Sequence, residues 1–397
     1  MAYNESDELR PKKRGKTTQM MPHFKRNGEM MYMENKILHD VIAQFTLPEG
    51  EYTVAPYGNG HINVTYCVVK NPGENQKRFI LQRVNRYVFK EPVKLIENVE
   101  QVTEYLRGVI EAEGGDADRE TLTLVPAKDG KNYVIDEEGE LWRVYLFVEQ
   151  TISRDLPDTT ELFKLSGSAF GKFQKQLSGF PAEKLVETIV DFHNTPARYQ
   201  QLMDAIANNA AGRLDSVAEE IAFCKKYEQE VHTLLDAMKN GEIPLRVTHN
   251  DTKLNNVLLD EKTGAGVCVI DLDTVMPGLA AYDFGDSIRF GANTAAEDET
   301  DLEKIQLSLP MFKAFAEGFV GEFGSAMGQK EKELLPMGAK MMTLECGMRF
   351  LADHLNGDKY FRIHRENHNL DRARNQFQLV RRMEEKWDEM MEIIKNI

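Results

Sequence analysis

The first part of the chain alternates apolar and polar residues in short runs, the pattern of β-strands. The regions predicted to hold strands are 52–69, 79–84, 133–135 and 141–148. The first of these contains two runs on either side of Gly58-Asn59-Gly60, which predicts a hairpin whose turn is nearly free of side chains. Two stretches in this part, 34–45 and 92–111, instead place apolar residues at helical spacing.

From residue 158 onward the pattern becomes helical. Apolar residues recur every three or four positions in most of the following segments. The predicted helices cover 163–177, 199–207, 214–239, 300–323, 330–353 and 370–396. In the first of them, Gly167 and Gly171 are one turn apart, so this helix can approach another closely.

These elements predict an α+β fold with two lobes. Residues 34–149 form a small β-rich lobe and residues 150–397 a larger, mostly helical one. Residues 1–33 are polar and carry a basic cluster, so we predict a disordered basic tail. The alternative for this tail is binding to nucleic acid or acidic lipid.

Composition limits the function. The chain has 397 residues and a net charge of −15, whereas nucleic-acid binders usually present a basic face. Its four cysteines are far apart and form no C-x-x-C pair, which argues against a zinc site and for a reduced, cytoplasmic setting. No apolar run approaches the roughly 18 residues of a membrane helix, and no secretory signal begins the chain. We expect neither a membrane nor a protein partner.

The stretch 246–286 carries the candidate chemistry. Asn256 follows Asp251 by five residues, and Asp271 comes after two apolar runs joined by a turn at 262–264. An aspartate, an asparagine five residues later and another aspartate after a hairpin is the arrangement of kinase catalytic loops. There the first aspartate accepts the hydroxyl proton, while the other two residues hold Mg²⁺ on the nucleotide phosphates.

Each of these residues alone has a simpler interpretation, because Asp and Asn are common in turns. Their joint spacing favours the functional interpretation. The acids stand at the ends of two β-rich runs, so a hairpin brings Asn256 and Asp271 near each other.

The same stretch resembles the aminoglycoside phosphotransferase and choline kinase superfamily, in which His-x-Asp-x-x-x-x-Asn precedes an Ile-Asp-x-Asp segment. RVTHNDTKLNN, VIDLDTVMPG and YDFGDSIRFG are similar to the branch that phosphorylates N-acetylhexosamines, and the resemblance runs from about residue 34 to the C-terminus. It implies a protein-kinase-like bilobal fold, ATP as co-substrate and Mg²⁺ as cofactor. Asp251 is then the catalytic base and the contact to the substrate hydroxyl.

On the nucleotide side, Gly58 and Gly60 are expected to lie over the phosphates, where backbone N–H groups can approach closely. Kinases carry a phosphate-contacting lysine on the third strand, and this chain has Gln82 there. Arg83 is next, but alternation places it on the opposite face. The resemblance places the adenine-contacting hinge at Phe147 to Glu149. It leaves open which residue neutralises the charge of the α-phosphate.

Further roles follow from the resemblance. His249 is implied to brace the catalytic loop, and Asp283 to fix it through backbone N–H groups. Asp273 is a supporting group or a sugar contact. On the helix 92–111, Glu97 or Glu100 stands where kinases place a bracing glutamate, although either can simply face solvent.

For the acceptor, the resemblance points to His61, Arg349 and Tyr360 as sugar contacts. It implies transfer to the anomeric hydroxyl of an N-acetylhexosamine. From the sequence alone, Arg349 would be a helix-surface arginine and Tyr360 a packed aromatic residue.

Two alternatives remain open at this point. One is a kinase of the same superfamily for choline, homoserine or an aminoglycoside, which an acidic acceptor site would favour. The other is a non-catalytic binding protein with this fold, which loss of Asp251, Asn256 or Asp271 would indicate; all three are present.

Overall fold

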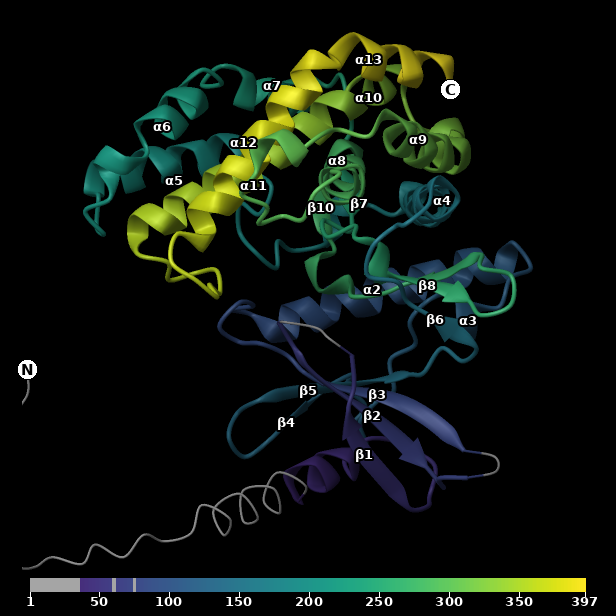
Figure 1. Cartoon of the computed structure of the whole chain (residues 1–397). Coiled ribbons are helices and arrows are strands. Elements are labelled where there is room, and N and C mark those ends of the chain that lie inside the picture. Colours follow the sequence, from purple (N-terminus) through teal and green to yellow (C-terminus); the bar gives the residue numbers. More distant parts are fainter. Residues whose placement is uncertain (1–35, 59–61, 74–75) are drawn as a thin grey trace, which may run out of the picture.

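The computed structural model describes residues 36–58, 62–73 and 76–397 (Figure 1). The predictions made for residues 1–33, for Gly60 and for His61 concern residues outside these ranges. The described chain forms a small part built on a sheet and a larger part built of helices, which we call the N-lobe and the C-lobe (Figure 1). This confirms the predicted α+β, kinase-like bilobal fold.

The N-lobe contains a five-stranded antiparallel sheet in the order β1-β2-β3-β5-β4. Its strands are β1 (Tyr52–Pro56), β2 (Val64–Lys70), β3 (Lys77–Arg83), β4 (Val134–Ile135) and β5 (Leu141–Leu146). The predicted strand regions are therefore confirmed. In the register, Gln82 of β3 lies between Thr65 of β2 and Arg143 of β5.

The two faces of this sheet have different partners. One face packs on the helical residues 36–42 and their extension to Phe45, and its buried strand residues include Phe79, Leu81 and Val144. Because side chains alternate along a strand, Gln82 and Arg143 lie on the other face. That face turns toward the C-lobe.

Helix α2 (Pro92–Ala112) runs beneath the C-lobe helices (Figure 1). Proline at its start fits the first helical turn, where a missing N–H has no consequence. Its buried Asn98 donates to the carbonyls of Val186 and Val275, at 2.8 and 3.1 Å, and thereby joins the two lobes.

A pair of small sheets holds the catalytic stretch. The three-stranded one consists of β6 (Thr151–Ile152), β8 (Val257–Asp260) and β9 (Gly266–Val269), and the two-stranded one of β7 (Arg246–Thr248) and β10 (Met276–Gly278). Val257 pairs with Val269, and the Ile270 N–H donates to the Asn256 carbonyl at 2.9 Å. The predicted hairpin is thus present, and it places Asn256 directly before one strand and Asp271 shortly after the other.

The remaining C-lobe is helical. Its main helices are α4 (Thr160–Gln176), α5 (Thr195–Asn208), α8 (Ala280–Gly291), α9 (Leu309–Phe323), α11 (Leu335–Asn356), α12 (His368–Glu385) and α13 (Trp387–Asn396). Helices α4 and α9 pack closely, as the two glycines of α4 predicted. A Cβ atom on Gly167 would lie 2.4 Å from the Phe315 carbonyl oxygen, and one on Gly171 would lie 2.5 Å from that of Phe319.

The single helix predicted over 214–239 is wrong. The chain there forms short pieces, namely η3 (Leu214–Ser216), α6 (Ala218–Lys225), η4 (Glu230–His232) and α7 (Thr233–Lys239). The buried residues Tyr227 and Val231 keep an apolar spacing that also suits a continuous helix. The Tyr227 N–H, however, bonds to Cys224, three residues back, which winds the chain more tightly than an α-helix.

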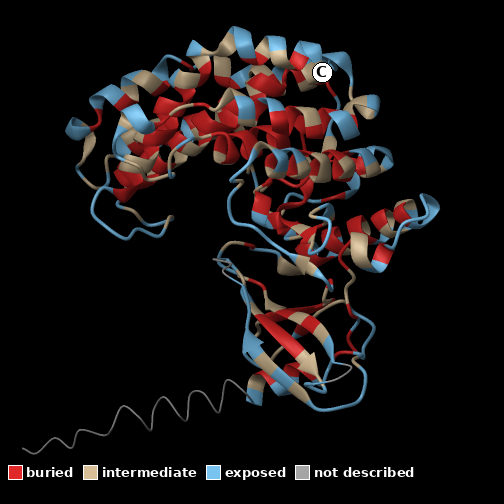
Figure 2. Ribbon diagram, turned by 45° about the vertical axis from the view of Figure 1, so that its right-hand side comes forward, coloured by how far each residue is buried: buried red, intermediate tan, exposed pale blue. Residues whose placement is uncertain are grey.

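Three further predicted helices begin late or divide. Helix α9 begins at Leu309, because Pro310 occupies its first turn and the Ser308 hydroxyl caps it. The predicted helix 330–353 divides into α10 (Gln329–Glu333) and α11 before Pro336, and 370–396 divides between α12 and α13. Figure 2 shows the buried residues concentrated on the inner sides of the C-lobe helices. Within the described residues, no helix is both long and apolar enough to span a membrane.

Candidate active site

The predicted catalytic loop, which follows β7, is held in place by a buried carboxylate. Asp283 of α8, which is fully buried, accepts the backbone N–H of His249 at 3.0 Å and that of Asn250 at 2.8 Å. Asp286, one turn later, accepts the N–H of Thr252 at 2.9 Å. Burial raises the pKa of Asp283, although His249 and these N–H groups oppose the rise. With its two backbone contacts, Asp283 fixes the path of the chain into Asp251.

His249 is buried and uses both ring nitrogens within the loop. The Asp251 N–H points at its Nδ1 at 3.3 Å, so Nδ1 acts as the acceptor. Its Nε2 then carries the proton and donates to the Ile270 carbonyl at 2.8 Å. The rings of Phe170 and Phe173 pack edge-on against the imidazole. The imidazole thereby braces Asp251 against the strand that leads to Asp271.

Asp251 is partly exposed, and it is flanked by Lys253 and Asn256. The Lys253 ammonium lies 2.8 Å from Oδ1, and the Asn256 amide donates to the Asp251 carbonyl at 2.8 Å. Burial alone would raise the pKa of Asp251, but the charge and hydrogen bond of Lys253 lower it below its ordinary value. Asp251 is therefore ionised at neutral pH and can accept a hydrogen bond from a hydroxyl group. Lys253 was not among the predicted site residues, although it follows Asp251 by only two positions.

Asp271 stands at a left-handed backbone position, with φ of 60°, where the chain leaves β9. Asp271 is open to solvent on one side, but protein atoms surround it on the others. This partial desolvation, together with the charges of Asp273 and Asp251, raises its pKa to about 6. Negative charge is thus in excess at this point.

The residues around Asp271 suit a divalent cation whose coordination shell is completed by ligands from outside the protein. Asp271 has no cationic partner among the described residues, and Asn256 donates through its amide nitrogen, which leaves the amide oxygen as a ligand. No group of three or more His, Cys, Asp or Glu side chains in the described ranges could hold a metal by itself. Mg²⁺ suits this donor set, because it commonly takes one or two protein oxygens and completes its shell with phosphates and water.

The sheet face above these residues carries a buried arginine that the sequence analysis missed. Arg143 of β5 donates to Gln82 Oε1 from Nε at 3.0 Å and from Nη2 at 2.8 Å. Its Nη1 lies 2.5 Å from Oδ1 of Asp273, and both side chains are almost fully buried. Arg83, in contrast, lies on the opposite face near the Trp142 ring, as alternation predicted.

The predicted hinge follows β5 beside Phe79, whereas the glycine turn begins beside Gln82, because the Tyr57 N–H bonds to the carbonyl of Thr65, the partner of Gln82 in the sheet. The Phe147 ring contacts Tyr57 edge-on at 5.7 Å and the Arg78 guanidinium at 3.8 Å, while Arg78 also pairs with Glu149. Gly58 has φ of 74°, a conformation that favours glycine, and no atom crowds the position of its missing Cβ. The side chains of Phe147 and Glu149 are therefore occupied with Arg78, and an adenine contact here would have to use backbone groups.

Neither candidate glutamate of α2 contacts Gln82. Glu97 is exposed, and Glu100 is hydrogen-bonded to Asn132. The α2 residue that reaches inward is Asn98, between them, which joins the lobes as described above.

Arg349 and Tyr360 lie together at the end of α11 and in the loop that follows. The Arg349 guanidinium is 5.4 Å from the Phe192 ring centroid, 6.0 Å from that of Tyr360 and 5.5 Å from that of Phe361. Asp353 accepts the backbone N–H groups of residues 359–361, each at 2.9 Å, and so fixes this loop. Tyr360 is 64% exposed.

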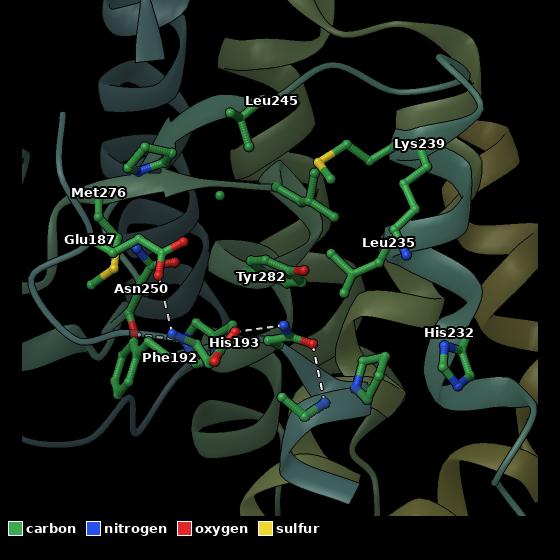
Figure 3. Close-up of a pocket in the computed structure, with 18 residues that line it drawn as sticks. Glu187, Phe192, His193, His232, Leu235, Lys239, Leu245, Asn250, Met276 and Tyr282 are labelled. Carbon is green, nitrogen blue, oxygen red and sulfur yellow. Dashed lines mark hydrogen bonds between the residues drawn. The ribbon is translucent and has the colours of Figure 1, made fainter. Parts of the chain in front are cut away.

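A buried His–Glu pair joins this region to the catalytic loop. His193 Nδ1 lies 2.9 Å from Glu345 of α11, one turn before Arg349, and its Nε2 lies 3.1 Å from the Asn250 carbonyl. Burial opposes a proton on His193, but the charge and hydrogen bond of Glu345 raise its pKa above the ordinary value. Figure 3 shows His193 and Asn250 in the wall of a neighbouring cavity of about 690 Å³, which Phe192 also lines.

Comparisons with known proteins identify the family of this chain. The sequence matches the model of the phosphotransferase enzyme family over residues 53–309, more than half of the chain. An aminoglycoside phosphotransferase from Alicyclobacillus acidocaldarius is similar in structure, with a TM-score of 0.56 at 13% identity over 90% of this chain and 96% of that one.

Two eukaryotic kinase structures are similar in fold. Plasmodium vivax ethanolamine kinase gives a TM-score of 0.51 at 13% identity, over 86% of this chain and 84% of that one. Choline kinase from Cryptosporidium parvum gives 0.50 at 13% identity, over 91% and 97%. At such identities these structures support the fold, and the family follows from the sequence match. The chain belongs to the phosphotransferase enzyme family and shares its kinase-like fold with aminoglycoside, ethanolamine and choline kinases.

Proposed function

We propose that this protein transfers the γ-phosphoryl group of ATP to the anomeric hydroxyl of an N-acetylhexosamine and gives the sugar 1-phosphate. In this proposal Asp251 is the base, Asn256 and Asp271 hold Mg²⁺, and Arg349 and Tyr360 contact the sugar. The solved structure of an aminoglycoside 2'-phosphotransferase, which is similar in fold to this chain with a TM-score of 0.51, is a GDP complex, and this supports the use of a nucleotide.

The proposed mechanism depends mainly on position and charge. Phosphoryl transfer has a loose transition state, so the base has to orient the hydroxyl and accept its proton late. An ionised Asp251 with a lowered pKa is suited to this role. Lys253, 2.8 Å from Asp251, supplies a positive charge where the transferred group would pass. Mg²⁺, when bound through Asn256 and Asp271, would neutralise charge on the phosphates.

The observation that carries the choice of acceptor is the environment of Arg349. Its guanidinium lies among three aromatic rings, and no carboxylate in the described part of the chain pairs with it. A permanent cation here disfavours cationic acceptors such as choline or an aminoglycoside. Aromatic faces together with guanidinium N–H donors suit a neutral sugar that carries hydroxyl and carbonyl oxygens.

Three carboxylates on α11 and in the loop after it strengthen this argument, because each already has a partner. Glu345 contacts His193 and Thr195, at 2.9 and 3.0 Å. Asp353 accepts three backbone N–H groups, and Asp358 pairs with Arg213 at 2.5 Å. None of these three is left to bind an ammonium group of a substrate.

One screen tests the proposal. ATP consumption is measured with GlcNAc, GalNAc, glucose, choline, ethanolamine, homoserine and kanamycin at equal concentrations. We expect turnover with the two N-acetylhexosamines and little with the cationic compounds. Phosphorus NMR of the product should show coupling to the anomeric proton, and a methyl glycoside blocked at O1 should be inert. Turnover of choline or kanamycin, a 6-phosphate product, or a reactive methyl glycoside would contradict the proposal.

A further inference from the structure

The place of the usual kinase lysine is occupied by a glutamine, and an arginine lies directly behind it. Gln82 is on the sheet face that turns toward Asp271 and Asp273, and Arg143 is its neighbour on β5. Arg143 is 1% exposed, so it cannot touch a ligand in this arrangement. Its positive charge nevertheless lies against the residues that face the phosphates in the proposed function.

Elementary hydrogen-bond chemistry fixes the orientation of Gln82. A guanidinium has five N–H donors and no acceptor, so the Gln82 atom that faces it has to be oxygen. Both Nε and Nη2 of Arg143 point at this Oε1 atom. The Gln82 amide nitrogen must then point the other way. One of its two N–H groups donates to the Thr65 hydroxyl at 3.1 Å. The other has no partner among the described residues.

Arg143 also determines which of the two neighbouring aspartates is free. Asp273 is held by Arg143 through Oδ1 and by the Asn63 amide through Oδ2, at 2.5 and 2.6 Å. Both partners come from the N-lobe. Asp273 is therefore buried in an ion pair with Arg143, whereas Asp271 is exposed and has no cationic partner among the described residues. Of these two carboxylates, Asp271 is thus available to a ligand, and Asp273 is used in contacts within the protein.

We propose that Arg143 is a positioning residue that replaces the kinase lysine indirectly: it orients Gln82 so that the amide nitrogen donates to the nucleotide α- or β-phosphate, and it supplies the neutralising charge from behind. The proposal rests on the proposed use of a nucleotide. In this arrangement Asp273 does for Arg143 what a helix glutamate does for the lysine in kinases, since it fixes the cation in place.

The test measures nucleotide affinity by calorimetry in the presence of Mg²⁺, with a non-hydrolysable ATP analogue, ADP and adenosine. In Arg143→Met, Gln82 loses its orientation, and a lost hydrogen bond to a charged group corresponds to roughly ten- to hundredfold weaker binding. We expect this loss for the ATP analogue and ADP and no comparable loss for adenosine. Arg83→Met, on the same sheet but the opposite face, is the matched control and should bind all three ligands as the wild type does.

A second variant separates binding from stability. Gln82→Glu keeps the shape of the side chain and gives Arg143 a carboxylate partner, so the melting temperature should be unchanged or higher. The same variant turns a donor into a negative charge that faces the phosphates. Affinity for the ATP analogue should fall at least tenfold, again without a comparable loss for adenosine. This variant keeps the proposal testable if Arg143→Met does not fold.

A third variant tests the charge directly. Gln82→Lys combined with Arg143→Met moves the cation to the usual kinase position, and it should bind the ATP analogue more tightly than Arg143→Met alone. If the wild type binds the analogue but Gln82→Glu binds it equally well, or if phosphate-bearing and phosphate-free ligands are affected alike, the inference about Arg143 is wrong while the proposed function stands. If the wild type binds neither ATP nor GTP analogues, both fail.

Discussion

The His193–Glu345 pair gives a quantitative prediction for Glu345→Gln. In the folded protein the side chains of His193 and Glu345 are 9% and 2% exposed, so solvent screens their interaction little. A hydrogen bond between charged partners contributes about 1.5–3 kcal/mol. We expect Glu345→Gln to lower the free energy of unfolding by this amount at pH 6. The exposed Glu322→Gln on α9 is a matched control and should leave the free energy within about 0.5 kcal/mol of the wild type.

The effect of Glu345→Gln on stability should also depend on pH, in a direction set by the pKa of His193. Burial opposes protonation of His193, but Glu345, the Asn250 carbonyl and Asp286 together raise its pKa above 6.5. A group with a raised folded-state pKa contributes stability that is complete below its unfolded pKa and is lost as pH rises through the folded one. The difference in unfolding free energy between wild type and Glu345→Gln should therefore shrink from pH 6 toward pH 9. Urea unfolding at several pH values measures it, and a difference that stays constant or grows with pH would refute the reasoning.

Three further predictions concern the loop and the helix packing. Asp251→Asn should lower kcat by roughly 10²–10⁴-fold and leave nucleotide affinity nearly intact, and near-wild-type kcat would contradict its role as base. Asn256→Ala and Asp271→Ala should both raise the Mg²⁺ concentration needed for half-maximal activity, Asp271→Ala more strongly because a formal charge is lost; metal titrations that overlay the wild type would exclude both as ligands. Gly167→Ala should destabilise the protein by about 1–3 kcal/mol, because its Cβ would lie 2.4 Å from a backbone oxygen, whereas Gly321→Ala, with nothing within 4 Å, should be neutral or stabilising.

Sequence patterns predicted local structure well where a single pattern fitted only one kind of structure. Alternation identified the strands of the N-lobe sheet, and the Gly167–Gly171 spacing identified a close helix contact. The pattern over 214–239 was misleading, because an apolar spacing of three and four residues is satisfied equally by a continuous helix and by short pieces joined by tight turns. Helix starts were misplaced where proline, at positions 310 and 336, determined the boundary.

The candidate site was only partly visible in the sequence. Asp251, Asn256 and Asp271 follow from spacing within one hairpin. Arg143 could not be assigned, because its partners Gln82 and Asp273 are 61 and 130 residues away and only the sheet register brings them together. One signal was available, however. A charged residue in the otherwise apolar run 141–148 requires a buried partner, and this indicates a polar contact across the sheet.

The contact between His193 and Asn250 has a consequence for how the protein could change its acceptor. In the proposed arrangement, the side chains that face the acceptor come from the segment at Phe192 and the segment 349–361, while Asp251, Asn256 and Asp271 come from a separate loop and hairpin, and Asp283 holds the start of that loop. The first set contacts the second at the Asn250 carbonyl, through His193, which follows Phe192. New acceptor specificities could therefore be selected by exchanging the first two segments, with the phosphoryl-transfer hairpin inherited unaltered.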